Sequence, residues 1–127
     1  MKEKHNLQPA WQNVDLGSID PNLYLDERDA PELTALWESA EATLSAAKAK
    51  TKAHTLKSLQ RDDKKYREEV FGWVMRATGH SELAACVSDD LGLIQEAYWH
   101  AVAGDPYINA LAQAYTAGRL PMQEDFV

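Results

Sequence analysis

Five residues that could bind a partner or do chemistry share one face of the segment from Leu83 to Ala101. At about 100° of rotation per residue, they fall roughly opposite the apolar positions of a helix: Asp89, Gly92, Glu96, Trp99 and His100. An aromatic anchor among polar groups fits the description of a partner-binding hot spot. The other interpretation is a central helix packed on both sides, with Trp99 covered by the N-terminal residues.

Asp89, Glu96 and His100 are also the candidates for metal binding or proton transfer. Glu96 and His100 are four residues apart, which places both on one helix face. A zinc or di-iron site needs three or four ligands, however, and the chain has neither an HExxH motif nor a repeated ExxH motif. Phosphate-binding loops and nucleophile elbows are missing too. We therefore expect no catalytic residue, no metal and no cofactor.

The remaining histidines and the single cysteine give no further site. His5, His54 and His80 are isolated along the chain and are expected in solvent. Cys86 lies next to the apolar positions and is expected to be a small buried hydrophobe. One cysteine can form neither an internal disulfide nor a CxxC metal clip, which favours a reducing cytoplasm. No segment resembles an export signal or a membrane span.

The charges divide the chain into three blocks. Residues 1–47 carry nine acids and three bases (−6), residues 48–67 eight bases and two acids (+6), and residues 68–127 nine acids and two bases (−7). The net charge of −7 disfavours nonspecific binding to nucleic acid or anionic lipid. The basic segment 48–67 could still contact nucleic acid, or the acidic part of a second copy.

Apolar periodicity predicts the helices that must position these residues. A first stripe repeats with helical spacing after a start at Asp29 and Pro31: Leu33, Trp37, Ala40, Leu44 and Ala47. Further stripes follow up to Gly79, from Ser81 to Gly104, and from Asp105-Pro106 to Gly118. Residues 32–71 contain no Gly or Pro, yet one helix of that length would exceed a compact domain of this size. We expect a break within 48–55, or else at an N-cap Asp63.

The sequence therefore predicts an all-α fold in a single small domain spanning 1–127. Residues 1–30 are expected as an extended, irregular N-terminal strap, and residues 31–120 as about four helices in a bundle-like arrangement. We expect a non-enzymatic, cytoplasmic interaction protein: an inhibitor, an immunity-type protein or an assembly accessory factor. Its acidic helical surface would dock a protein partner, favouring a basic one, and self-association is an open alternative. The alternatives are a small enzyme or metal binder using Asp89, Glu96 and His100, and a nucleic-acid-associated regulator using 48–67.

Overall fold

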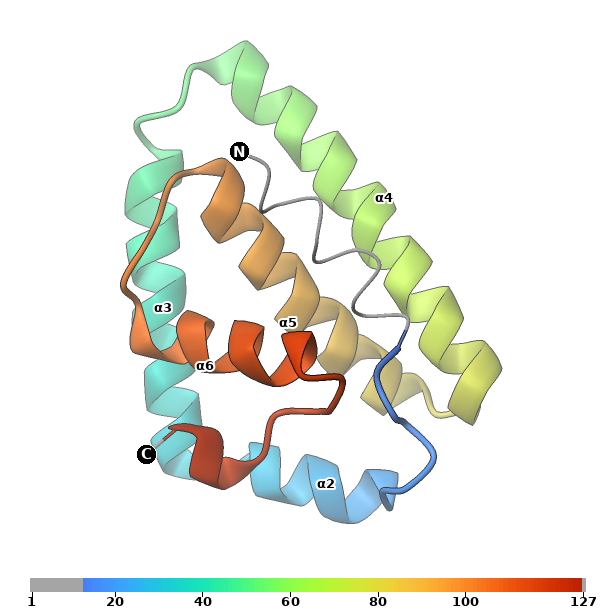
Figure 1. The fold of residues 1–127 in the computed structure, drawn as a ribbon. Coiled ribbons are helices and arrows are strands. Elements are labelled where there is room, and N and C mark those ends of the chain that lie inside the picture. The colour runs from blue at the N-terminus through green and yellow to red at the C-terminus, as the bar shows by residue number, and fades with distance from the viewer. Residues whose placement is uncertain (1–12, 127) are drawn as a thin grey trace.

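The computed structural model describes residues 13–126, which form five α-helices, a short 3-10 helix and no strand (Figure 1). The helices are α2 (Pro21–Arg28), α3 (Pro31–Lys48), α4 (Ala53–Thr78), α5 (Ser81–Trp99) and α6 (Pro106–Thr116), and η2 (Gln123–Phe126) follows them. The predicted all-α, bundle-like fold is confirmed. None of the helices in this range is long and apolar enough to cross a membrane.

The boundaries of the later helices follow the local signals in the sequence. The chain breaks between Lys48 and Ala53, as expected, and Asp63 lies inside α4 instead of capping it. Gly79 ends α4 with a φ of 68°, and the side chain of Asp105 accepts a hydrogen bond from the Ile108 N–H at the start of α6. Helix α5 begins at Ser81, as predicted, and its N-cap is His80, whose Nδ1 accepts from the Leu83 N–H.

The N-terminal strap is shorter than predicted. Residues 1–12 lie outside the described part of the chain, and residues 13–20 are irregular, with Val14 and Leu16 buried on the helices. From Pro21 onward the chain is helical, because Asp20 caps α2 by accepting from the backbone N–H groups of Asn22 and Leu23. Asp29, the predicted cap of the next helix, does not cap it; α3 starts after Ala30 with no side-chain cap.

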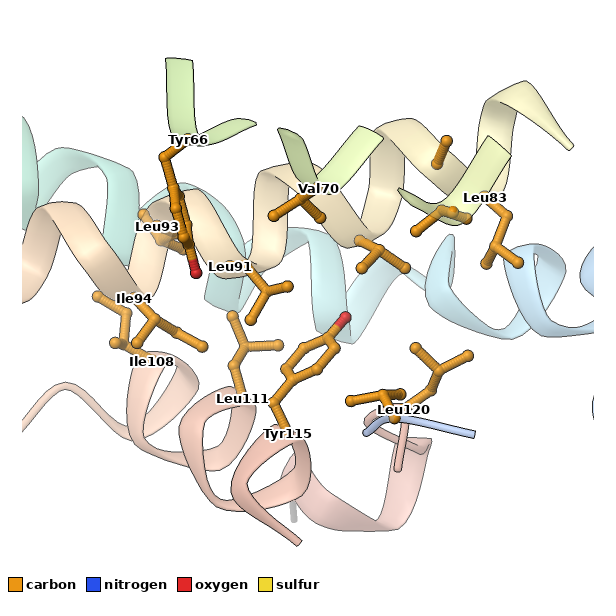
Figure 2. Close-up of a cluster of buried hydrophobic side chains, with 14 of the residues drawn as sticks. Tyr66, Val70, Leu83, Leu91, Leu93, Ile94, Ile108, Leu111, Tyr115 and Leu120 are labelled. Carbon is orange, nitrogen blue, oxygen red and sulfur yellow. The ribbon is translucent and has the colours of Figure 1, made fainter. Parts of the chain in front are cut away.

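Helix α5 is central to the fold. It packs along α4, and α6 crosses it on another side (Figure 1). Every residue from Leu91 to Ala97 is buried, so this stretch is enclosed all round, as the packed-helix interpretation predicts. Side chains of α4, α5 and α6 meet in the main apolar cluster, which includes Tyr66, Val70, Leu91, Ile94, Leu111 and Tyr115 (Figure 2).

The buried face of α3 differs from the predicted stripe at Trp37. Leu33, Ala40 and Leu44 are buried as expected, but the Trp37 side chain is 41% exposed. The reason is Leu36, which is partly buried against the core and shifts the centre of the buried face away from Trp37. The tryptophan therefore lies at the edge of that face, about 60° from its centre at 100° per residue.

Candidate functional site

A cleft with a volume of about 380 Å³ opens between the end of α2, the first half of α3 and the first half of α5. Its apolar lining comes from Leu25, Leu33, Trp37 and Tyr107. Helix α5 contributes Glu82, Cys86, Asp89 and Asp90, whose spacing places them on one face of the helix. Asp29, in the connection between α2 and α3, lines the cleft as well. This volume falls in the range of binding sites in proteins.

Trp37 is the most exposed aromatic anchor at this cleft. Among the described residues, only Trp37 and Leu23 are large hydrophobic side chains with high exposure, and Leu23 lies on α2 outside the cleft. Apolar residues that stay exposed singly are common on protein surfaces. A tryptophan at the mouth of an acidic cleft is different, because tryptophan is enriched among the residues that dominate binding energies.

The carboxylates give the cleft an excess of negative charge. Within residues 13–126, neither Asp29 nor Glu82 has an ion pair or a side-chain hydrogen bond. The Asp89 side chain is 67% exposed and accepts from Arg67 Nη1 at 3.1 Å. Partial removal from water raises the pKa of the Asp89 carboxyl; Arg67 opposes this change and the charge of Asp90 adds to it. The site therefore favours a cationic occupant.

Arg28, the one guanidinium that lines the cleft within the described range, is already paired. Arg28 donates to both oxygens of Asp90, at 2.8 and 2.7 Å, and its side chain is only 8% exposed. Burial opposes the charge of Arg28, but the attraction of Asp90 outweighs it and raises the pKa of the guanidinium. Arg28 also donates to the hydroxyl groups of Tyr24 and Tyr107, each at 2.9 Å. Arg28 is therefore taken up by Asp90, and among the described residues Asp29 and Glu82 remain without a counter-charge while Asp89 has only a share of Arg67.

Cys86 lines the same cleft but has no activated thiol. Burial raises the pKa of the Cys86 thiol to about 12, and the charge of Asp90 acts in the same direction. A thiol is nucleophilic or metal-binding only as the thiolate. At neutral pH the side chain therefore contributes a neutral, weakly polar surface to the cleft.

Three of the predicted site residues meet around a second arginine. Arg67 of α4 lies across Gly92, where an added Cβ would be 2.3 Å from the guanidinium carbon. Arg67 donates to Asp89 and to Glu96, and Lys48 pairs with the other oxygen of Glu96 at 2.8 Å. Glu96 is only 7% exposed, so this carboxylate joins α5 to α3 and α4 within the fold.

Trp99 and His100 lie elsewhere, at the end of α5. They line a second, shallower groove of about 810 Å³ together with residues of the connection between α3 and α4. His100 Nδ1 lies 3.1 Å from Thr51 Oγ1, and both Trp99 and His100 are half-buried. The side chains of Glu96 and His100 therefore have different partners, because Glu96 pairs with Lys48 and Arg67 whereas His100 lies against Thr51. Among residues 13–126, no three His, Cys, Asp or Glu side chains are grouped as metal ligands.

Sequence reasoning missed most of the cleft. The sequence pattern predicts Trp37 in the core and Asp29 at a helix start, and it singles out neither residue as part of a site. One usable signal was Arg28, the only basic residue between residues 5 and 47. A lone arginine in an acidic segment is a candidate for a specific ion pair, but its partner Asp90 is 62 residues away.

The sequence is similar to one known protein family. The family model described as Immunity protein PIM1 matches residues 2–122. No curated protein and no solved structure matches the chain significantly. Since the matched range covers nearly all of the sequence, the chain belongs to the Immunity protein PIM1 family.

Proposed function

We propose that this chain protects its own cell by binding a toxic protein and neutralising it through the face around the Trp37 cleft. An immunity protein, in the ordinary meaning of the term, counteracts a toxin, and family membership supports that class of function. The observation that carries the location is Trp37, a 41% exposed tryptophan at the mouth of a cleft lined by carboxylates. We further propose that this binding takes place in the cytoplasm.

In the proposed mechanism, the chain neutralises the toxin by binding to it and covering part of its surface. Binding would bury the exposed part of the Trp37 indole, and the removal of apolar area from water at a central anchor supplies much of the affinity of such interfaces. The carboxylates of Asp29, Glu82 and Asp89 surround the anchor. Their charge would attract a basic surface over a distance and reject acidic ones, which gives speed and specificity of association. Neither step requires a catalytic group.

The experiment begins with capture of the partner from a lysate of the source organism. The captured protein is then expressed in a host cell alone and together with the chain. We expect growth arrest by the partner and rescue by the wild-type chain.

Trp37→Ala should weaken binding by at least about 2 kcal/mol. Because Trp37 is partly exposed, we expect a smaller loss of folding stability, about 1 kcal/mol.

Leu23→Ala is the matched control, because Leu23 is a large exposed hydrophobic side chain outside the cleft. It should leave binding and rescue unchanged. A partner that binds the Trp37→Ala variant as tightly as the wild-type chain would contradict the proposed location.

The groove at Trp99 and His100 is the competing location for the interface. Trp99→Ala belongs in the same binding assay, because the sequence predicts a partner-binding role for this residue. If Trp99→Ala weakens binding and Trp37→Ala does not, the toxin docks at the end of α5. Urea unfolding of both variants separates a loss of contact from a loss of fold.

A further inference from the structure

We infer that the Trp37 cleft receives an arginine side chain of the bound protein. This inference rests on the proposed function, because it assumes that the bound molecule is a protein. It specifies what the proposed interface recognises, which family membership does not supply. Two features of the cleft carry it, namely its charge and the exposed surface of Trp37; a third observation is the buried Nε of Arg28, which has no acceptor among the described residues.

The charge of the cleft calls for a cation. Of the residues that the structure describes, four carboxylates line it, from Asp29, Glu82, Asp89 and Asp90, against the single guanidinium of Arg28. Asp90 and Arg28 neutralise each other through two hydrogen bonds. Asp89 shares Arg67 with Asp63 and Glu96, and in the described part of the chain Asp29 and Glu82 pair with nothing. A cation entering the cleft would therefore meet carboxylates from the α2–α3 connection and from α5.

Trp37 favours arginine over lysine. The guanidinium is planar, stacks on an aromatic ring and directs its N–H groups outward in the plane, where two carboxylates can accept them. The cleft provides both kinds of group that an arginine uses in this way, an exposed indole on α3 and carboxylates on two other segments. A lysine ammonium is a compact, strongly hydrated charge that gains less from a flat ring and loses more on leaving water.

Arg28 supplies the reason to expect a peptide and not a free cation. Its side chain is more than nine-tenths buried and lines the cleft, yet its Nε has no hydrogen-bond partner within residues 13–126. A buried donor without an acceptor costs free energy. A backbone carbonyl beside the incoming arginine would satisfy this donor once the side chains at the cleft shift to admit it.

The test uses three short peptides as probes: acetyl-Gly-Arg-Gly-amide, the same peptide with lysine, and the same peptide with citrulline, which keeps the shape of arginine without its charge. Binding is followed by NMR through the indole N–H signal of Trp37, which Trp37→Phe identifies. We expect a saturable shift with the arginine peptide, binding several-fold weaker with lysine, and no saturable shift with citrulline.

Charge removal provides the matched controls. The double variant Asp29→Asn, Glu82→Gln should weaken binding of the arginine peptide at least tenfold. The double variant Asp26→Asn, Glu38→Gln removes the same charge from exposed positions on α2 and α3 outside the cleft and should have little effect. Equal losses in both double variants, or no preference for arginine over lysine and citrulline, would overturn the inference.

The outcomes distinguish this inference from the proposed function. If toxin binding depends on Trp37 but the arginine peptide shows no preference, only the inference fails. If the arginine peptide binds as expected but Trp37→Ala still binds the toxin at full strength, the proposed location fails, and the arginine site does not serve toxin binding.

Discussion

Gly92 shows how one residue can determine a network of charges. The Arg67 guanidinium lies against this glycine and bonds to Asp63 and Glu96 at the contact between α4 and α5. Asp63 and Glu96 are both largely buried, and burial raises the pKa of Asp63 although Arg67 opposes the change. Arg67 therefore offsets the free-energy cost of burying the carboxylates of Asp63 and Glu96, and Gly92 leaves the space that the Arg67 guanidinium occupies.

We predict that Gly92→Ala destabilises the fold by about 1–3 kcal/mol. The new Cβ would lie 2.3 Å from both Nε and Cζ of Arg67, so the guanidinium must move away from its carboxylates. This loss should exceed the gain of up to about 1 kcal/mol from replacing glycine in a helix. Urea unfolding measures the difference.

Gly72→Ala, in α4, is the matched control for this prediction. There the nearest atom to an added Cβ is the flexible end of Arg76, at 3.3 Å. We expect Gly72→Ala to stabilise the protein by up to about 1 kcal/mol. Stabilisation by both substitutions would show that Arg67 is not held by Gly92.

At the level of the helices, the end of α5 carries backbone strain. Ala101 has a φ of 57°, a left-handed conformation in which a Cβ is unfavourable. The hydrogen bond from the Val102 N–H to the Ala97 carbonyl, at 2.8 Å, closes the helix in the way that usually places glycine here. The strained residue lines the groove that contains Trp99 and His100.

We predict that Ala101→Gly stabilises the protein by about 0.5–1 kcal/mol. The substitution relieves the steric cost of the left-handed conformation, which exceeds the extra freedom that glycine gains in the unfolded chain. Ala103→Gly is the control, because Ala103 does not have a positive φ and should gain nothing. Thermal or urea unfolding of the two variants compares them directly. Equal effects would mean that the conformation of Ala101 is not strained.

The segment after α6 is held by one carboxylate. Asp125 of η2 accepts from Arg119 at 2.7 and 2.8 Å and from the Met122 N–H at 2.6 Å. These hydrogen bonds, that of Arg119 first, lower the pKa of Asp125. A lowered native pKa means that this stabilisation is complete above the unfolded value of about 3.9 and is lost as pH falls through the native value.

We predict that Asp125→Asn costs about 1 kcal/mol at neutral pH and that the difference from the wild-type chain shrinks in acid. The difference should begin to fall below about pH 4 and should shrink further as pH falls through the lowered native pKa of Asp125. Unfolding free energies of both proteins across this range provide the measurement. A difference that stays constant down to the lowest pH would show that the charge of Asp125 does not stabilise η2.

The helix pattern could be predicted where the signals are local. Asp105-Pro106, Gly79 and Gly118 mark boundaries through their own backbone preferences, and the structure confirms them. Helix α2 was missed because it has eight residues and buries only Tyr24, too few for a periodic stripe. The prediction that Trp37 is buried was wrong, because the apolar stripe of one helix does not show which other helices will cover it.

The candidate site could be predicted only in part, because it depends on ion pairs between residues that are far apart in the sequence. An immunity-type protein was one of the expected classes, and the family match supports that class. The charge of the cleft depends on Arg28 meeting Asp90 and on Arg67 meeting Asp89, contacts that no local pattern indicates. Partner binding through Asp89, Gly92, Glu96, Trp99 and His100 stays a prediction, as does self-association through residues 48–67.

Across the whole molecule, the pair of Arg28 and Asp90 links three helices. Arg28 comes from α2 and Asp90 from α5, and α6 provides Tyr107 and Tyr115. The Tyr115 hydroxyl donates to Asp90 at 2.7 Å. Burial, together with the charge of Asp90, raises the pKa of the Tyr115 hydroxyl well above its ordinary value. Tyr115 therefore stays protonated and remains a donor to Asp90.

We predict that Asp90→Ala costs about 3–5 kcal/mol, because it leaves the buried Arg28 without its counter-ion. Arg28→Met alone should also be costly, since among residues 13–126 it leaves the buried Asp90 carboxylate with the Tyr115 hydroxyl as its one remaining donor. The double variant Arg28→Met, Asp90→Ala removes both charges and should be less damaging than the sum of the single substitutions. Urea unfolding of the four proteins completes the cycle. Additive effects would mean that Arg28 and Asp90 do not stabilise each other.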